Sequence, residues 1–210
     1  DLTATMDMAS AEAGAAFGDA RVYLERSVAQ GRHIEVQVLG DGAGKVVHLG
    51  ERDCSVQRRH QKLIEETPAP HLPDHFRAQA HEASLRFAAR LDYRGAATVE
   101  FLYDVARNQF YFLEMNARIQ VEHPVTEEVT GIDLIAEQIA IANGAENGGG
   151  LRFSQSDIAI NGAAIECRVN AEDPSRDFMP SPGTVATAHW ASGEGIRVDT
   201  HIVDGAKIPP

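Results

Sequence analysis

The chain has 210 residues, 43% of them hydrophobic, which is enough for one large domain or two small ones with a sizeable core. Thirty-one acidic residues against nineteen basic ones give a net charge of -12, which argues against nucleic acid as a partner because phosphate backbones need clustered positive charge. The sequence has no apolar run of about 18 residues, so no membrane span is predicted. The first residues do not resemble a signal peptide, and the two cysteines offer no disulfide framework, so we expect a cytoplasmic protein.

The N-terminal part of the chain predicts a helix and then a β-hairpin. Residues 1–30 predict mostly helix, with a break at Gly18 and Asp19. The apolar residues at 34, 36 and 38 alternate with polar ones, as in a half-buried strand, and a turn at 41–44 leads to a second strand at 45–49. Residues 51–66 are polar and weakly periodic, and we expect a loop that ends at the prolines 68 and 70.

An amphipathic helix and a second hairpin are predicted next. The helix opens near Pro73 and Asp74, and its spacing predicts one buried stripe formed by Phe76, Ala80, Ala83, Phe87 and Leu91. Residues 98–104 and 109–116 are β-rich and are joined by a short polar loop, which predicts antiparallel pairing.

The C-terminal part of the chain predicts two short helices, followed by a region of β-strands. One helix is expected after Thr126, and a longer one from Asp133 to Ala142. The low-complexity run AENGGG at 145–150 is the best candidate for a domain boundary. Strands are expected beyond it at 164–169, 184–190 and 196–203, and the chain stops in mid-pattern, so we expect both ends to continue in a longer protein.

The strongest functional signal is the nine-residue stretch from Glu114 to Glu122. If it is one extended strand, every second side chain lies on one face: Glu114, Asn116, Arg118, Gln120 and Glu122. Met115, Ile119 and Val121 would then be buried on the other face. A solvated edge strand also alternates, but a row that mixes metal-ligand and anion-binding groups favours a working site.

A metal site is predicted beside this row. Glu100 and Glu114 lie at nearly equal distances from the hairpin loop, so they face each other if the register is correct, with Asn116 on the same face. Opposed carboxylates repel unless a cation joins them, and these oxygen donors suit Mg²⁺ or Mn²⁺. The alternative is a register shifted by one, in which Glu100 faces solvent.

Other polar groups are weaker candidates. His33, Glu35 and Gln37 are read as the polar outer face of a hairpin. In the predicted loop, Gln57, His60 and Lys62 stand near two arginines, either as a solvated basic loop or as an anion site. The histidines at 71, 75 and 81 are expected on the surface, His48 has no clear constellation, and both cysteines are expected to pack rather than react. No phosphate-binding Gly-rich motif is present.

Three motifs resemble the biotin carboxylase family, the ATP-grasp component of biotin-dependent carboxylases. They are ERDCSVQRRHQK at 51–62, EMNARIQVEHPVTE at 114–127 and ECRVNAED at 166–173. The segments 180–183 and 201–210 look most like the biotin carboxylase subunit of acetyl-CoA carboxylase, an enzyme of fatty acid biosynthesis. The resemblance implies an α+β ATP-grasp fold with an antiparallel sheet and flanking helices. It implies the end of a lid subdomain at 1–28, the ATP-grasp core at 29–148 and a β-rich C-terminal domain at 149–210.

The resemblance also implies roles at the matching positions. ATP would be bound by Leu24, Glu25, His33, Gln57, His60, Leu102, Leu113 and Glu114. The metal would be bound by Glu100, Glu114 and Asn116. Bicarbonate would be bound by Lys62, Arg118, Gln120, Val121 and Glu122. Arg168 would face the ureido oxygen of biotin.

The implied reaction converts ATP, bicarbonate and biotin into ADP, phosphate and carboxybiotin through carboxyphosphate. Glu122 would be the general base, Lys62 and Arg118 would hold bicarbonate in line with the γ-phosphate, and Arg168 would stabilise the biotin enolate. Implied partners are a biotin carboxyl carrier protein or domain, carboxyltransferase subunits and a second copy of the full-length chain. The family's Gly-rich lid lies upstream of residue 1, so we expect the isolated chain to be inactive or nearly so.

Two other functions remain open at this stage. Another bicarbonate-using ATP-grasp ligase, such as a carbamoyl-phosphate synthase half, would share the metal residues but would not need Arg168. A non-catalytic module that keeps the fold is the second alternative, and the intact row from Glu114 to Glu122 speaks against it.

Overall fold

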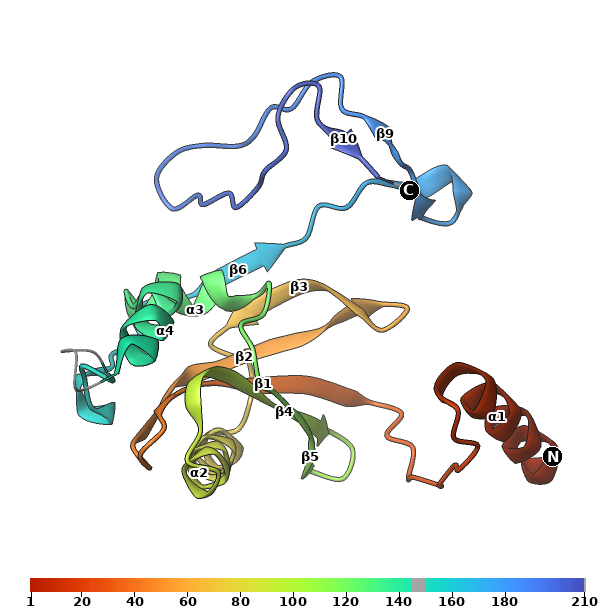
Figure 1. Ribbon diagram of the computed structural model, residues 1–210, viewed down its shortest axis with the longest axis horizontal. Coiled ribbons are helices and arrows are strands. Elements are labelled where there is room, and N and C mark those ends of the chain that lie inside the picture. Colours follow the sequence, from red (N-terminus) through yellow and green to blue (C-terminus); the bar gives the residue numbers. More distant parts are fainter. Residues whose placement is uncertain (145–149, 210) are drawn as a thin grey trace. The chain divides into compact units, whose positions relative to one another are not determined.

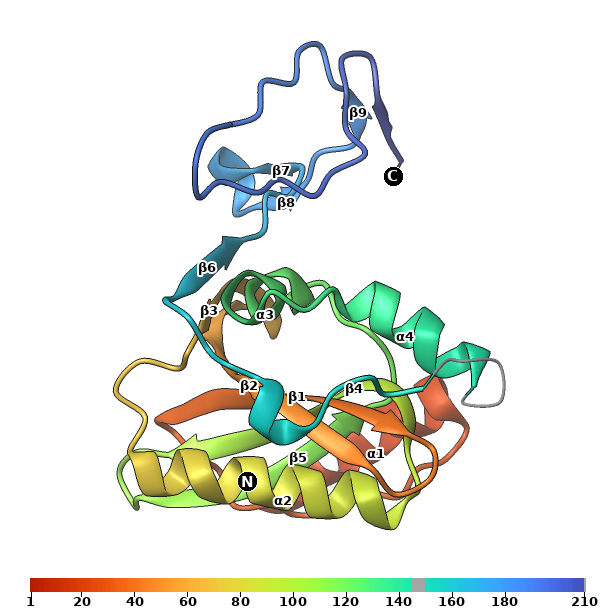
Figure 2. The same ribbon diagram turned by 90° about the vertical axis from the view of Figure 1, so that its left-hand side faces the viewer.

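The computed structural model describes residues 1–144 and 150–209. The chain divides into two compact units, Asp1–Glu166 and Cys167–Pro210. Figures 1 and 2 show the chain in two views turned by 90°. The boundary predicted between residues 148 and 149 falls outside the described residues and stays a prediction.

The first unit is built on a six-stranded sheet with the strand order β5-β4-β1-β2-β3-β6. Its strands are β1 (Gly31–Asp41), β2 (Val46–Arg58), β3 (Gln61–Thr67), β4 (Arg94–Asp104), β5 (Gln109–Asn116) and β6 (Ala164–Cys167). The pairs β1–β2, β1–β4, β2–β3 and β4–β5 are all antiparallel. An antiparallel sheet with flanking helices, as predicted, is therefore confirmed.

The two faces of the sheet pack against different helices (Figure 2). On one face, Val36, Val38 and Val99 pack with Ala80 and Ala88 of α2 (Asp74–Arg90). On the other face, the strand residues Leu39, Val47, Leu49 and Ala96 pack with Leu134 and Ile141 of α4 (Leu134–Asn143). Because successive side chains of a strand alternate, β1 directs residues 34, 36 and 38 towards α2 and residues 33, 35 and 37 to the opposite face.

The polar run 51–66 is not a loop, and this prediction was wrong. It forms the end of β2 and most of β3, joined by a tight turn at Arg59 and His60, which both have positive φ. Lys62 pairs with Gln57 across this hairpin. The run is polar because both strands carry side chains into polar clusters on either face of the sheet, so hydrophobic periodicity could not reveal it.

Helix α2 occupies the predicted range, but its buried stripe differs. The buried residues are Phe76, Ala80, Ser84 and Ala88, spaced by four, whereas Phe87 is 40% exposed and Leu91, predicted to be in the stripe, is 56% exposed. Ser84 is buried without an unpaired hydroxyl, because its Oγ donates to the backbone oxygen of Ala80 at 2.7 Å.

His81 is not a surface residue, contrary to the prediction. Its ring stacks on that of His48 from β2, with the ring centroids 4.0 Å apart. Its Nε2 lies 2.7 Å from Oε2 of the buried Glu51. Burial first, and the neighbouring His81 or Arg77 second, lower the pKa of both histidines to about 4, so both rings are neutral at pH 7.

The ends of the remaining helices of this unit are set by their caps. Helix α1 (Leu2–Phe17) begins at the side chain of Asp1 and ends at Gly18, and no further helix follows before β1, so the predicted continuation to residue 30 was wrong. Helix α3 (His123–Thr130) starts three residues before the predicted Thr126, with Pro124 in its first turn, where proline costs no hydrogen bond. Helix α4 begins as predicted behind Asp133, whose side chain accepts from the N–H of Ala136.

The strands of the second unit are short, and a 3-10 helix at Pro174–Arg176 lies between the first two of them. The strands are β7 (Glu172–Asp173), which pairs with β8 (Met179–Pro180), and β9 (Gly183–Thr184), which pairs with β10 (Lys207–Ile208). The strands predicted at 184–190 and 196–203 are therefore wrong apart from residue 184. In the part of the chain that the structure describes, no helix is long and apolar enough to cross a membrane.

Candidate active site

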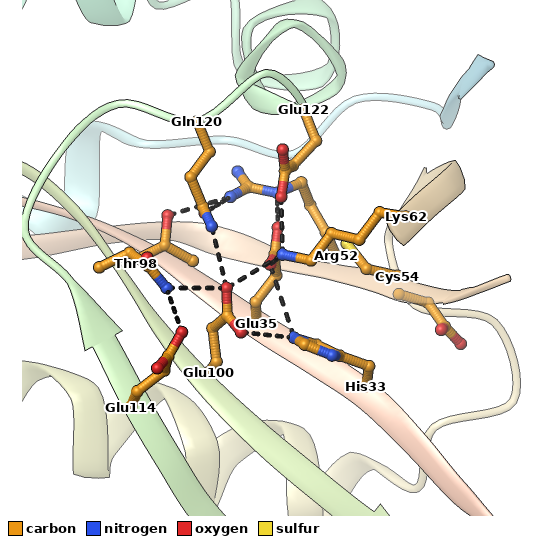
Figure 3. A network of polar contacts seen from close by, with 12 residues as sticks. His33, Glu35, Arg52, Cys54, Lys62, Thr98, Glu100, Glu114, Gln120 and Glu122 are labelled. Carbon is orange, nitrogen blue, oxygen red and sulfur yellow. Dashed lines mark hydrogen bonds and ion pairs between the residues drawn. The ribbon is translucent and has the colours of Figure 1, made fainter. Parts of the chain in front are cut away.

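Buried polar side chains gather on the face of the sheet opposite α2 (Figure 3). Strand β1 contributes Glu35 and Gln37, which are both 0% exposed. They are not the solvated outer face of a hairpin, as their alternation first indicated. Burying a charged carboxylate costs free energy unless nearby groups neutralise its charge. The groups that surround Glu35 therefore define the site.

The opposed carboxylates predicted on β4 and β5 are present. Glu100 pairs with Glu114 in the register of the two strands, and a bulge follows immediately after Glu100. The Nδ2 of Asn116 donates to Oε1 of Glu100 at 3.0 Å and to Oε1 of Glu114 at 3.1 Å. The predicted register is therefore confirmed, and Glu100 does not face solvent, being 5% exposed.

Lys62 of β3 is the cation at the centre of the cluster (Figure 3). Its Nζ lies 2.5 Å from Oε2 of Glu35, 3.0 Å from Oε1 of Glu100 and 2.7 Å from Oε1 of Glu122. Burial acts to lower the pKa of Lys62, but the carboxylates of Glu35 and Glu122 outweigh it and raise that pKa above its usual range. Lys62 is therefore an ammonium group at neutral pH.

Two of the carboxylates around Lys62, those of Glu35 and Glu100, are held in their ionised form. Burial acts to raise the pKa of Glu100, but hydrogen bonding to His33 and the charge of Lys62 outweigh it and lower that pKa to about 2. Burial likewise opposes ionisation of Glu35, and the charges of Arg52 and Lys62 outweigh it, so the pKa of Glu35 is lowered. The site therefore contains fixed negative charges at neutral pH.

The predicted nine-residue strand is wrong beyond Asn116. Strand β5 ends there, and residues 117–122 lead into α3, which has Glu122 at its N-cap. Gln120 and Glu122 are nevertheless buried in the site, and Nε2 of Gln120 donates to Oε1 of Glu100 at 2.9 Å. Val121, expected to be buried, is 60% exposed. A turn, and not a strand, therefore brings the second half of the row to the cluster.

Arg118 is placed at the rim of the site. Its side chain is exposed, and its Nη2 donates to Oδ1 of Asn116 at 3.3 Å while its Nη1 donates to the backbone oxygen of Ile119 at 3.2 Å. It is thus linked to the Glu100–Glu114–Asn116 group through Asn116.

The predicted ATP-binding residues are only partly brought together. His33 lies 2.7 Å from Oε2 of Glu100, and its Nδ1 lies 3.2 Å from Nε2 of Gln57. His60 is exposed in the β2–β3 turn, and Leu24 and Glu25 are exposed in the segment between α1 and β1. The two predicted apolar walls are Leu102, half-buried on β4, and Leu113, 45% exposed on β5. Arg168 belongs to the second unit, and its role stays a prediction.

Arg52 is the buried residue of this site that sequence reasoning missed. Its guanidinium lies among Glu35, Gln37, Thr98, Gln120 and Thr126, and its Nε is 2.5 Å from Oε1 of Glu35. Cys54, two residues further along β2, is also buried, and its thiol can come within 4.8 Å of carboxylate oxygens of Glu35 and Glu122. The sequence did contain a signal for these residues, because positions 52 and 54 are two apart and so lie on the same face of a strand. The polar run concealed the strand and therefore this signal.

The residues present fit a divalent metal ion. Glu100 and Glu114 offer carboxylate oxygens from adjacent strands, and Asn116 offers an amide that can turn its oxygen to the same point. His33, Glu35 and Glu100 also bring possible ligand atoms within 4.8 Å of one another. In that second group the ammonium of Lys62 already contacts the carboxylates of Glu35 and Glu100. The Glu100–Glu114–Asn116 group is therefore the better place for a cation.

Taken together, the geometry defines a class of site. Carboxylates suited to a divalent cation adjoin a buried lysine and a second buried carboxylate, Glu122, with an exposed arginine at the rim. Such an arrangement can hold a metal-bound phosphate and a small anion side by side, with a base at the anion. This is the layout expected of an ATP-dependent ligase that activates an anionic substrate.

Comparison with known proteins agrees with this class of protein and identifies the family within it. Residues 1–147 match the family described as "Carbamoyl-phosphate synthase L chain, ATP binding domain", and residues 166–210 match the family described as "Biotin carboxylase C-terminal domain". A biotin carboxylase of Nostoc is 52% identical over 202 residues, which is 96% of this chain and 44% of the relative. A biotin carboxylase of Pseudomonas aeruginosa is 50% identical over all 210 residues and 45% of its own length.

Solved structures give the same result. The biotin carboxylase–β-γ-ATP complex from Campylobacter jejuni has a TM-score of 0.91 at 46% identity, covering 100% of this chain and 45% of that one. The biotin carboxylase domain dimer of 2-oxoglutarate carboxylase from Hydrogenobacter thermophilus, in complex with MgADP, ADP and bicarbonate, has a TM-score of 0.90 with the same identity and coverage. The chain therefore belongs to the biotin carboxylase family and has its ATP-grasp fold. It spans less than half the length of these relatives.

Proposed function

We propose that the protein containing this chain carboxylates biotin with bicarbonate at the expense of ATP, as the first half-reaction of a biotin-dependent carboxylase. The observation that carries this proposal is the contact of Lys62 with Glu35, Glu100 and Glu122 beside the Glu100–Glu114–Asn116 group. One cluster therefore contains a lysine that could bind an anion and a buried carboxylate, next to a group that could bind a metal. Relatives named for this activity, and a solved relative that contains MgADP and bicarbonate, support it.

In this proposal Glu122 is the general base of the first step. It removes the proton of bicarbonate as the bicarbonate oxygen attacks the γ-phosphorus of ATP, which forms carboxyphosphate and releases ADP. Glu122 is buried, and its Oε1 lies 2.7 Å from the Nζ of Lys62, so the proposed base stands beside the cation that would hold the anion. Lys62 and Arg118 orient the anion, with Gln120 and the backbone of Val121 as further contacts.

The metal-binding group serves the nucleotide. Glu100, Glu114 and Asn116 would hold Mg²⁺ or Mn²⁺, which neutralises charge on the phosphates when it is bound. His33, Gln57 and His60, with Leu24, Glu25, Leu102 and Leu113, are the proposed nucleotide contacts. Carboxyphosphate then breaks into CO₂ and phosphate, the phosphate takes the proton of the biotin ureido nitrogen, and the nitrogen attacks CO₂. Arg168 is proposed to stabilise the negative charge on the ureido oxygen.

The proposed partners follow from this half-reaction. A biotin carboxyl carrier protein or domain would present biotin, carboxyltransferase subunits would consume carboxybiotin, and two copies of the full-length chain would form a dimer in the cytoplasm. A solved relative is described as a biotin carboxylase domain dimer. Relatives are named for pyruvate, 2-oxoglutarate and urea carboxylases, so the acceptor varies among proteins that share this fold. For the present protein we propose acetyl-CoA, on the resemblance of segments 180–183 and 201–210 alone.

The test compares two glutamates of helix α3 and its N-cap in the whole protein. Glu122→Gln removes the proposed base, and Glu128→Gln changes an exposed acid of the same helix. Biotin- and bicarbonate-dependent ADP release should fall about 100-fold or more in Glu122→Gln, the scale of general-base catalysis, and stay within about twofold in Glu128→Gln. Equal activity of the two variants would overturn the role of Glu122. Carbamoyl phosphate formed with ammonia, in place of carboxybiotin, would favour the carbamoyl-phosphate synthase alternative.

A further inference from the structure

Arg52 uses its guanidinium in five hydrogen bonds within the site. A guanidinium has five N–H donors in one plane, and here five acceptors surround it. Nε donates to Glu35, Nη1 donates to Oε1 of Gln37 at 2.8 Å and to Oγ1 of Thr126 at 2.9 Å, and Nη2 donates to Oγ1 of Thr98 at 3.1 Å and to Oε1 of Gln120 at 3.4 Å. The side chain is 0% exposed.

These acceptors come from separate parts of the chain. Glu35 and Gln37 belong to β1 and Thr98 to β4, so three of the five bonds lie within the rigid sheet. Gln120 belongs to the turn that follows β5 and Thr126 to α3, so the two residues lie on either side of Glu122 in the chain. Arg52 is therefore the link by which the sheet holds the segment that carries Glu122.

The bond to Gln120 also decides which way its amide points. The Oε1 of Gln120 accepts from Arg52, so its Nε2 is turned towards Glu100, to which it donates at 2.9 Å. The bond to Thr126 fixes α3 one turn beyond its N-cap, and that cap is Glu122. A lysine at position 52 could neutralise Glu35 but could not supply five donors in a plane.

We propose that Arg52 is a positioning residue for the bicarbonate step, acting through Gln120 and α3 on Glu122 and touching neither substrate. The inference rests on the proposed function, because it assigns Arg52 to bicarbonate and not to ATP. Loss of the link should weaken bicarbonate use and leave nucleotide binding nearly unchanged, since the Glu100–Glu114–Asn116 group is held by the β4–β5 pairing.

Two threonines provide matched probes of this link. Thr126→Val and Thr98→Val are nearly isosteric, and each removes one neutral acceptor from the same guanidinium, without leaving a charge unpaired. Thr126→Val breaks the bond to α3, whereas Thr98→Val breaks a bond within the sheet. A general loss of stability would affect both variants alike, and a positioning role affects only the first.

The experiment uses the whole protein and measures kcat, the KM values for bicarbonate and ATP, and amide hydrogen exchange of residues 117–126. For Thr126→Val we expect kcat/KM for bicarbonate to fall about tenfold, which is the loss of about 1.4 kcal/mol, with KM for ATP within about twofold and faster exchange in 117–126. For Thr98→Val we expect kcat/KM for bicarbonate and KM for ATP to stay within about twofold of the unchanged protein. Arg52→Lys should show the Thr126→Val pattern more strongly.

Equal effects of the two threonine variants, or unchanged exchange in Thr126→Val, would overturn the proposal. If Arg52→Lys does not fold, the threonine pair still decides. If the unchanged protein shows no bicarbonate- and biotin-dependent ADP release, the proposed function fails. Hydrogen exchange then still tests the anchoring: faster exchange only in Thr126→Val keeps Arg52 as the anchor of this segment, and any other result removes it.

Discussion

Replacing Lys62 by methionine tests the electrostatic design of the site. The substitution keeps the length of the side chain and removes the ammonium group that faces Glu35, Glu100 and Glu122. At separations of 2.5–3.0 Å and an effective dielectric constant of about 20, each contact is worth about 6 kcal/mol before the cost of burying the charges. The net cost of removing one partner from a buried ion cluster is smaller, about 3–5 kcal/mol.

The pH dependence separates this effect from a simple loss of packing. In the unchanged protein the pKa of Glu100 is about 2, below its ordinary value of 4.5, so its contribution to stability is present above pH 4.5 and is lost as the pH falls towards 2. Without Lys62 the pKa values of Glu35 and Glu100 should rise, so these two carboxyl groups take up protons more readily as the pH falls from 7.5 to 5. The destabilisation should therefore be largest at pH 7.5 and smaller at pH 5.

Thermal unfolding of the whole protein at these two pH values is the assay. We expect Lys62→Met to lower Tm by about 10 °C at pH 7.5, from about 2–4 °C per kcal/mol, and by clearly less at pH 5. Lys45→Met, which changes an exposed lysine, should lower Tm by no more than about 1 °C at either pH. A Tm unchanged by Lys62→Met, or lowered equally at both pH values, would refute the reasoning.

Three further predictions address the metal, the histidine pair and the cysteines. Glu114→Gln should raise the Mg²⁺ concentration needed for half-maximal ADP release about tenfold with Tm unchanged, because Glu114 is exposed; an unchanged Mg²⁺ requirement would remove it from the metal site. His48 and His81 both have a pKa of about 4, so the free energy of unfolding should fall as the pH drops from 6.5 towards 4. His81→Gln should reduce this loss by about 1 kcal/mol, after allowance for partial exposure, as measured by urea unfolding at pH 7.5 and pH 5. An equal loss in the variant and in the unchanged protein would show that the idea is wrong. A thiol reagent should modify the exposed Cys167 quickly and the buried Cys54 slowly, since burial raises the pKa of Cys54; faster labelling of Cys54, by mass spectrometry, would contradict this.

The sequence predicted those parts of the site that depend on local pairing. Glu100 and Glu114 stand at nearly equal distances from a short loop, so antiparallel pairing had to bring them together, and it does. Alternation also assigned residues 33, 35 and 37 to one face of β1 correctly. It did not reveal that Glu35 and Gln37 are buried, because their burial depends on Arg52 and Lys62 from other strands.

The parts that failed depend on where an element ends or on contacts between distant residues. The alternation of residues 114–122 continues past Asn116, but the strand does not, and the turn that follows was invisible to a period of two. The buried stripe of α2 includes Ser84, a polar residue that bonds to its own helix, so hydrophobicity pointed instead to the exposed Phe87. A strand was predicted at 184–190, but a strand needs a partner, and within this stretch only residue 184 pairs, with Lys207 of β10.

The most direct test of the proposed function is transfer of label from ¹⁴C-bicarbonate to biotin by the whole protein. With ATP and Mg²⁺ we predict labelled carboxybiotin in a ratio of about one per ADP released at early times, and about 100-fold less of both products, or lower still, with Glu122→Gln. ADP released without labelled biotin, or labelled biotin formed equally well by Glu122→Gln, would contradict the account.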